Sequence, residues 1–159
     1  MAANNVINVD MTSSGWTLFT TTITATTTSP TLGAGSTTQS YYLQVGKILY
    51  VKFIFTNVSI TGATSGSGTY LFNIPSGFTI NSSIVTFSNP DFAMGSSIFK
   101  NGSGSVIGFG IVTAHNSTNY KIMMYTNGVT AFNFLSSTYL AINNATLYSY
   151  SASVQVPIN

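Results

Sequence analysis

The sequence has no cysteine, no arginine and no glutamate, and its charged side chains are four lysines and two aspartates among 159 residues. The lack of cysteine excludes disulfides and thiolate metal sites, so the fold has to be stabilised by packing, hydrogen bonds and contacts between subunits. The scarcity of ions removes most routes to acid–base chemistry. These absences point away from an enzyme and toward a chain that assembles or presents a surface to a ligand.

A net charge of +2 is too small for the clustered basic surface that binds nucleic acid. No run of 18 apolar residues occurs, and the residues from Met1 to Val6 lack the basic and apolar regions of a signal peptide. We therefore expect no nucleic-acid partner, no membrane insertion and no secretion signal. A surface with so few charges repels its own copies weakly, which favours an oligomer over a free monomer.

The residues that are present are those of pleated strands joined by polar turns. Hydrophobic residues make up 44% of the chain and aromatic residues 13%, and much of the remainder is Thr, Ser, Asn and Gly. The length fits one domain with a core of its own. We expect residues 13–159 to form a single β-sandwich domain and residues 1–12, which show no periodicity, to form an N-terminal arm or linker.

Apolar side chains that alternate with a period of two mark the strands. Leu49, Val51, Phe53 and Phe55 share one face of a first strand, and Ile54 lies on an opposite face that is itself partly apolar. This strand is expected to be covered on both sides, by its own chain or by a neighbouring subunit.

A second strand carries Tyr70, Phe72 and Ile74 on one face and ends at Pro75, which has no N–H to continue the ladder. The other predicted strands are 107–112 and 120–125, which pair across 115–119, the C-terminal run 147–156, and the weaker candidates 16–25, 39–45, 84–87, 97–99, 129–134 and 138–142. Short strands spaced by turn residues predict an all-β fold, a jelly-roll-type antiparallel β-sandwich of about 8–10 strands.

Glycine and small polar residues mark the connections. Gly108 and Gly110 share one face of their strand, which indicates that another backbone or a large ring comes close there. The segments 26–40 and 60–68 are rich in Thr, Ser and Gly and are expected to be long surface loops. The glycine-rich run 102–108 lacks the Lys-Ser/Thr pair of a nucleotide-binding loop, so it is predicted to be a flexible loop before a strand.

Few side chains could carry catalysis or bind a metal. The acids, Asp10 and Asp91, are distant in sequence, and the lone imidazole, His115, has no second histidine at a metal-ligating spacing. A sparse Ser–His–Asp site is the enzymatic alternative, although no Gly-x-Ser-x-Gly elbow occurs. We expect no catalytic residues, no metal and no cofactor.

Two turns combine aromatic rings with Asn and Asp side chains, a composition that suits stacking on sugar rings. The candidate ligand-binding residues in them are Asn89, Asp91, His115, Asn116 and Tyr120. Five Asn-x-Ser/Thr sequons, the number that chance gives in so polar a chain, begin at Asn57, Asn81, Asn101, Asn116 and Asn144.

Several short motifs in the first half of the chain occur in an order that resembles a known domain. They are Trp16-Thr17-Leu18-Phe19-Thr20, Pro30-Thr31-Leu32-Gly33-Ala34-Gly35, Tyr42 to Val45 with Gly46-Lys47, and Gly66 to Pro75. In this order they resemble a phage and large-virus virion domain, of the kind found in tail-fibre head modules and in trimeric jelly rolls with tumour necrosis factor-like folds. The second half of the chain is similar to this domain only in its general pattern of strand-like segments.

The resemblance implies a homotrimer, other virion proteins as partners, and loops at one end for a host-surface glycan or protein receptor. It implies no catalytic residues. We therefore expect a non-enzymatic virion structural protein, a trimeric fibre-head or capsid-surface module on the capsid or tail surface that serves assembly and host attachment.

Subunit contacts are expected on the strand faces that oppose the core. Ile54 and Leu71 are the candidate interface residues, because each faces away from the apolar side of its strand. The alternative function is a stand-alone carbohydrate-binding module or lectin, which would be a monomer or dimer with aromatic rings along an exposed groove.

Overall fold

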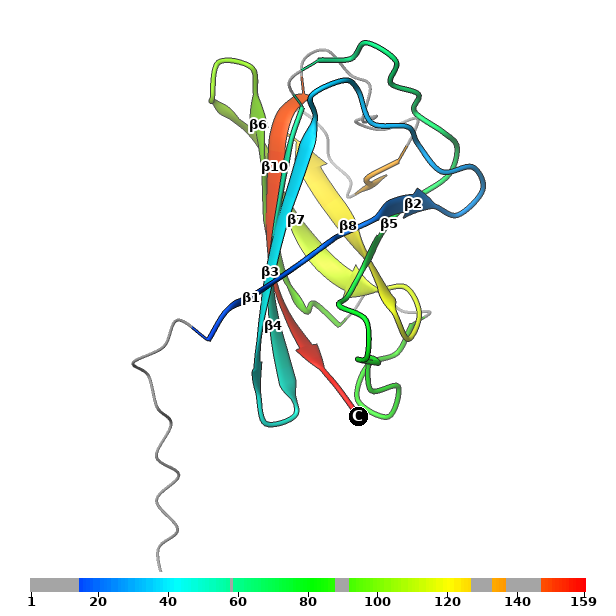
Figure 1. Cartoon of the computed structure of the whole chain (residues 1–159). Coiled ribbons are helices and arrows are strands. Elements are labelled where there is room, and N and C mark those ends of the chain that lie inside the picture. Colours follow the sequence, from blue (N-terminus) through cyan, green and yellow to red (C-terminus); the bar gives the residue numbers. More distant parts are fainter. Residues whose placement is uncertain (1–14, 58, 88–91, 127–132, 137–146) are drawn as a thin grey trace, which may run out of the picture.

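The computed structural model describes residues 15–57, 59–87, 92–126, 133–136 and 147–159, and its strands form one curled antiparallel sheet (Figure 1). The strands are β1 (Thr17–Phe19), β2 (Ile23–Ala25), β3 (Thr37–Val45), β4 (Ile48–Thr56), β5 (Tyr70–Asn73), β6 (Gly95–Asn101), β7 (Val106–Ala114), β8 (Asn119–Thr126), β9 (Asn133–Phe134) and β10 (Leu147–Pro157). The described residues contain no helix. The prediction of an all-β fold of the sandwich and jelly-roll type is confirmed.

The strand order across the sheet is β1-β3-β4-β10-β6-β7-β8-β5-β2, with β9 paired to β8. β1 and β2 stand at opposite ends of this order yet follow one another in the chain. Figure 1 shows the connecting segment crossing from one to the other. In that segment the Thr21 hydroxyl hydrogen-bonds the Ser40 hydroxyl of β3 at 2.6 Å, and the Thr22 N–H donates to Asn73 Oδ1 at the end of β5 at 2.5 Å. The segment therefore ties the two halves of the curled sheet together.

The core lies on the concave side of the sheet, where the predicted alternation places the apolar faces. Leu49, Val51, Phe53 and Phe55 of β4 are at most 1% exposed, which confirms the predicted core face of that strand. The neighbouring strand β10 contributes the predicted apolar face that includes Tyr150. The register pairs each of the four buried β4 residues directly with an inward residue of β10. The inward side chains of β10 are Tyr150, Ala152, Val154 and Val156.

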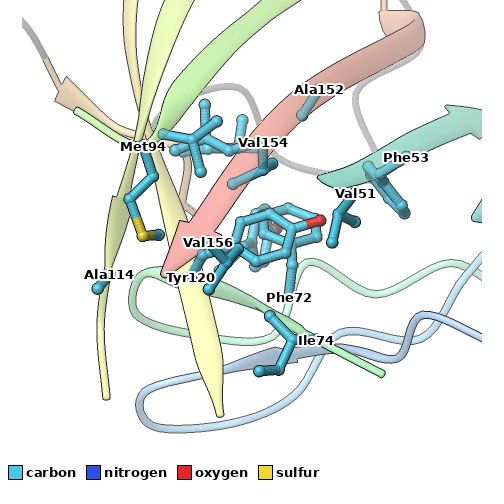
Figure 2. Packing of buried hydrophobic residues seen from close by; sticks show 14 of the residues in the cluster. Val51, Phe53, Phe72, Ile74, Met94, Ala114, Tyr120, Ala152, Val154 and Val156 are labelled. Atoms are coloured by element: carbon cyan, nitrogen blue, oxygen red, sulfur yellow. The ribbon is translucent and has the colours of Figure 1, made fainter. Parts of the chain in front are cut away.

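An aromatic cluster fills the centre of this core (Figure 2). The Tyr150 ring lies 4.8 Å from Phe55, 5.6 Å from Phe53, 5.8 Å from Phe99 and 5.9 Å from Phe72, measured between ring centroids. Such pairs contribute about 0.5–1.5 kcal/mol each beyond the area that they bury. Rings from β4, β5, β6 and β10 thus meet at one point.

The predicted hairpin of two strands across residues 115–119 is confirmed, since β7 pairs with β8 from Ala114–Tyr120 outward. Gly110 lies on the buried face of β7, as the alternation predicts. A Cβ at Gly110 would lie 2.5 Å from both the Met123 carbonyl oxygen and Ser97 Oγ. The close backbone approach that the two glycines predict is therefore present at Gly110.

One weaker strand prediction is wrong. Residues 84–87 lie in and after a turn that Asn81 begins. Asn81 Oδ1 accepts from the Ser83 N–H at 2.9 Å, and the Asn81 carbonyl accepts from the N–H groups of Ile84 and Val85 at 3.1 and 3.0 Å. These local bonds use the donors that a strand would have offered to a neighbour.

The other weak predictions survive with altered bounds. Segment 16–25 contains two strands, 39–45 and 97–99 are parts of longer ones, and only 133–134 of segment 129–134 is described as strand. Segment 138–142 and the proposed arm lie outside the described residues.

The two predicted loops, 26–40 and 60–68, are only partly irregular. Residues 37–40 belong to β3, and the remaining parts pair with each other through bridges at Thr28–Ser67 and Thr31–Thr64. Gly66 has a φ of 61°, and a Cβ there would overlap the Thr28 carbonyl oxygen. A distorted ribbon therefore extends the β2–β5 pair, and glycine at position 66 is required for it.

Replacing Phe53 by Ala should lower the free energy of unfolding by about 3–5 kcal/mol, because it opens a cavity in the aromatic cluster. Urea unfolding followed by far-UV circular dichroism measures the change. Ile84→Ala is the control, since Ile84 is 54% exposed and should change stability by less than about 1 kcal/mol. A Phe53→Ala variant that melts within about a degree of the wild type would contradict the placement of Phe53 in the core.

Candidate functional site

The outer face of the sheet carries a row of exposed apolar side chains. The register aligns Ile54 of β4, Ser151 of β10, Ile98 of β6 and Phe109 of β7 across four adjacent strands. Ile54 is 43% exposed, Ile98 39% and Phe109 59%. We call this row, centred on Ile54, Ile98 and Phe109, the outer apolar row. The row arises because β4, β6 and β7 carry apolar side chains on both faces, one toward the core and one toward the outside.

A furrow runs along β10 on the same face, because the outward side chains of that strand are small. Ser151 and Ser153 form its floor, and longer side chains of the flanking strands rise on either side. The hollow has a volume of about 230 Å³. Its banks are Lys52 and Ile54 of β4 and Ser96 and Ile98 of β6. The furrow thus offers hydroxyl groups between aliphatic walls.

A second hollow of about 400 Å³ adjoins β10 farther along, next to Gln155 and Pro157. It is lined by Ile48 of β4 and by the segment that leads into β6, including Phe92, which is 39% exposed. At Gly95 a Cβ would overlap the Ser153 carbonyl oxygen, so β6 and β10 approach closely between the two hollows.

The charges on this face are positive. Lys52 Nζ lies 4.7 Å from the centre of the Trp16 ring, in a cation–π contact. Lys100, at the end of β6, is exposed. No acidic side chain belongs to the described part of the chain, since both aspartates lie outside it. The outer face therefore combines aliphatic rows, hydroxyl groups and lysines.

The predicted ligand-binding turn 115–120 closes the β7–β8 hairpin. The His115 N–H donates to the Asn119 carbonyl at 2.9 Å, and Asn116 Oδ1 accepts from the N–H groups of Thr118 and Asn119 at 2.9 and 2.8 Å. The Asn116 oxygen is thus committed to the turn itself, and the partly exposed His115 ring is the main group left for a ligand.

Tyr120 requires a correction. Its side chain is fully buried beside Phe72, with ring centroids 5.4 Å apart and planes inclined by 19°. Alternation along β8 turns this ring inward, so it belongs to the core and is not accessible to a surface ligand. Asn89 and Asp91 lie outside the described residues, and the structure therefore does not bring the five candidates together.

The two candidate interface residues differ in exposure. Ile54 stands on the outer apolar row, as predicted. Leu71 is only 8% exposed, so its own chain already covers it and it offers little surface to a neighbouring subunit. Ile98 and Phe109 were not predicted from the sequence. The position of Phe109 on the strand face opposite Gly108 and Gly110 was the signal that could have indicated an outward ring.

The described residues hold no group of three or more His, Asp or Glu side chains that could bind a metal. The same part of the chain contains no helix long and apolar enough to cross a membrane.

No protein-family model and no curated protein matches the sequence. In structure the chain is similar to the Dettilon tailspike protein, with a TM-score of 0.52 and 18% sequence identity. The match covers 91% of this chain and 24% of the tailspike chain, so this chain spans about a quarter of that protein's length. The fold is therefore one that also forms a part of a phage tailspike protein. At the level of fold, this agrees with the virion-domain resemblance of the sequence.

His115 should titrate below the ordinary pKa of 6.5, because burial and the positive charge of Lys121 both disfavour the imidazolium. The folded chain then binds its proton less readily than the unfolded chain does. The stability that this difference contributes is complete above the unfolded pKa and is lost as the pH falls from there through the lower pKa of the folded chain. Ring resonances in a nuclear magnetic resonance titration measure the pKa.

Lys121→Gln should raise the pKa of His115 part of the way back, since it removes the second of the two causes. Lys47→Gln, in the β3–β4 turn, is the matched control and should leave it unchanged. A wild-type His115 that titrates above 6.5 would contradict the partly buried placement of the ring.

Proposed function

We propose that the chain is a non-enzymatic structural module of a virus tail, which assembles as a homotrimer and contributes to host attachment. The observation that carries the proposal is the outer apolar row. The fold similarity to part of a tailspike supports the setting in a virion. The motif resemblance of the first half of the chain supports a trimer in particular.

The outer apolar row has the character of a subunit interface. Ile98 and Phe109 are exposed side by side on the paired strands β6 and β7, and Ile54 is exposed in line with them on β4, across Ser151 of β10. Monomeric proteins rarely expose large apolar patches. Interfaces concentrate aliphatic and aromatic side chains at their centre and charged groups at the rim. Lys52 and Lys100 flank the row, which suits a rim position for both.

The lysines also limit how copies can meet. If two outer faces were superposed directly, lysines would face lysines with no described acid between them, and like charges across an interface are unfavourable. An offset arrangement, in which the apolar rows meet and the lysines stay near water, avoids this repulsion. The trimer that the motif resemblance implies is one such arrangement.

Size-exclusion chromatography with light scattering tests the oligomer. A trimer has three times the chain mass of 16.8 kDa, that is 50.4 kDa. Ile54→Lys and Phe109→Lys should each shift the mass toward 16.8 kDa, because a lysine at the centre of the interface has to be desolvated. Ile84→Lys, at a similarly exposed side chain in the 82–84 turn, should leave the trimer intact.

A wild-type chain that stays monomeric at micromolar concentration would overturn the trimer. A trimer that tolerates both substitutions would instead move the interface away from the outer apolar row.

The second candidate function is carbohydrate binding without assembly, which the furrow favours. Its serine hydroxyls and aliphatic banks, with Trp16 and Lys52 beside them, provide hydrogen-bonding groups and apolar surface for a sugar ring. This alternative predicts glycan-array binding by a monomer. Ser153→Leu should abolish that binding because it fills the furrow, while Ser82→Leu, in the exposed 82–84 turn, should not. Array binding that survives Ser153→Leu would exclude the furrow as the sugar site.

We propose that the module does not catalyse a reaction. His115 is the single side chain with an ordinary pKa near neutrality. It lies in a turn whose described neighbours include no carboxylate to orient it, and burial together with Lys121 keeps its pKa low. A host-attachment role for the same module requires binding only.

A further inference from the structure

The turn between β6 and β7 concentrates hydrogen-bond donors on one side-chain carbonyl. Asn101 Oδ1 accepts from the Ser103 hydroxyl at 2.7 Å, from the Ser105 N–H at 3.0 Å and from the Ser103 N–H at 3.1 Å. The Asn101 main chain also closes the turn, since its N–H donates to the Ser105 carbonyl at 3.0 Å and its carbonyl accepts from the Gly104 N–H at 2.9 Å. Three donors on one oxygen polarise the amide carbonyl and leave its carbon electron-poor.

The residue after Asn101 is Gly102, which leaves this carbonyl open to attack. Gly102 is exposed, and a Cβ built there would meet no atom within 4 Å. Within the described part of the chain, no hydrogen bond occupies the Gly102 N–H or the Asn101 side-chain Nδ2. The nucleophile and the leaving group of a cyclisation are therefore both unengaged, and water has access to the site.

We propose that Asn101 is a site of spontaneous deamidation through a succinimide. The Gly102 main-chain nitrogen loses its proton to solvent base and attacks Asn101 Cγ, which forms a carbon–nitrogen bond. The tetrahedral oxyanion develops on Oδ1, where the three donors stabilise it. Water protonates Nδ2, and collapse of the oxyanion re-forms the carbonyl, breaks the bond from Cγ to Nδ2 and releases ammonia. Water then opens the five-membered imide at either carbonyl and yields aspartate or isoaspartate.

Two other turns provide an internal comparison. Asn116 Oδ1 accepts from Thr118 and Asn119, and Asn81 Oδ1 accepts from Ser83, so both amides are similarly polarised. Each is followed by a serine, whose side chain crowds the attacking nitrogen. The Thr118 hydroxyl is a third donor to Asn116 Oδ1, at 3.2 Å, so the number of donors there equals that at Asn101. Asn101 is distinguished by the glycine that follows it.

The modification would alter the outer face of the sheet. The new carboxylate lies next to Lys100 at the end of β6, and the net charge falls from +2 to +1. The aspartate product keeps the acceptor that Ser103 and Ser105 require, and charged acceptors make stronger bonds. The isoaspartate product adds a main-chain atom at the start of the turn and disturbs the β6–β7 register.

The test is peptide mapping by mass spectrometry of the whole folded chain during incubation at mildly alkaline pH. Asn101 is expected to convert about tenfold faster than Asn81 and Asn116, because the residue after it has no side chain to crowd the attacking nitrogen. Gly102→Ala should abolish the difference. That variant is tolerated by the fold, since Gly102 is not in the left-handed region and has open space around it. A melting temperature equal to that of the wild type confirms that the Gly102→Ala variant folds.

Ser103→Ala separates the contribution of the turn from that of the Asn-Gly pair. It removes the hydroxyl donor and should slow conversion of Asn101 severalfold, while Ser117→Ala, beside Asn116, should leave the Asn101 rate unchanged. Equal rates at Asn101, Asn81 and Asn116, or a wild-type rate in Gly102→Ala, would overturn the proposal. A wild-type rate in Ser103→Ala would overturn the role of the hydroxyl donor.

Discussion

The curvature of the sheet depends on the packing of the Tyr150 ring against rings from three other strands. Phe53 and Phe55 of β4 and Phe99 of β6 come from the strands that flank β10, whereas Phe72 of β5 comes from the far end of the strand order. Only a curled sheet brings β5 over β10. The hydroxyls of Tyr120 and Tyr150 are buried without hydrogen-bond partners among the described residues, which costs about 1–3 kcal/mol each.

Burial also raises the pKa of both phenols, with neighbouring tyrosines adding to the effect at Tyr150, so the two rings stay neutral. The core therefore depends on aromatic area and excludes ionisation. The surface turns likewise use neutral groups. Asn81 and Asn116 cap their turns with a neutral amide oxygen, where many proteins use a carboxylate. A chain with so few ions can close its connections and still leave the outer sheet face to apolar and hydroxyl groups.

The strands that are half buried could be predicted from sequence, because one apolar parity per strand is sufficient to orient it. Phe53 and Phe72 are examples, and both lie in the core as the alternation requires. The placement of side chains at chain reversals was harder to predict from sequence. Tyr120 is the second residue of β8, and its alternation with the buried Ile122 and Met124 turns it inward, whereas the polar turn beside it suggested a surface position. Ile84 lies in a turn set by hydrogen bonds of Asn81, which no periodicity reveals.

The candidate site was only partly predictable for a related reason. The outer parity of β4 identified Ile54, but Ile98 and Phe109 join it through strand neighbours that are distant in sequence. Leu71 has the same outward parity in its strand, yet the structure buries it. Whether an outward side chain is covered depends on what packs above it, and a pattern within one strand contains no information about that.

The short strands at both ends of the sheet order bear on how copies of this chain associate. β1 and β2 each contribute three residues, and their common connection holds them to the rest of the chain. Long unpaired edges invite strand addition and open-ended fibres. β1 pairs with Ser40, Tyr41 and Tyr42 in the middle of β3, so it divides the edge of that strand and leaves no long uninterrupted run of main-chain groups to recruit another copy. Growth by lengthening the ladder is thereby disfavoured, which suits a finite, closed particle of the kind proposed above.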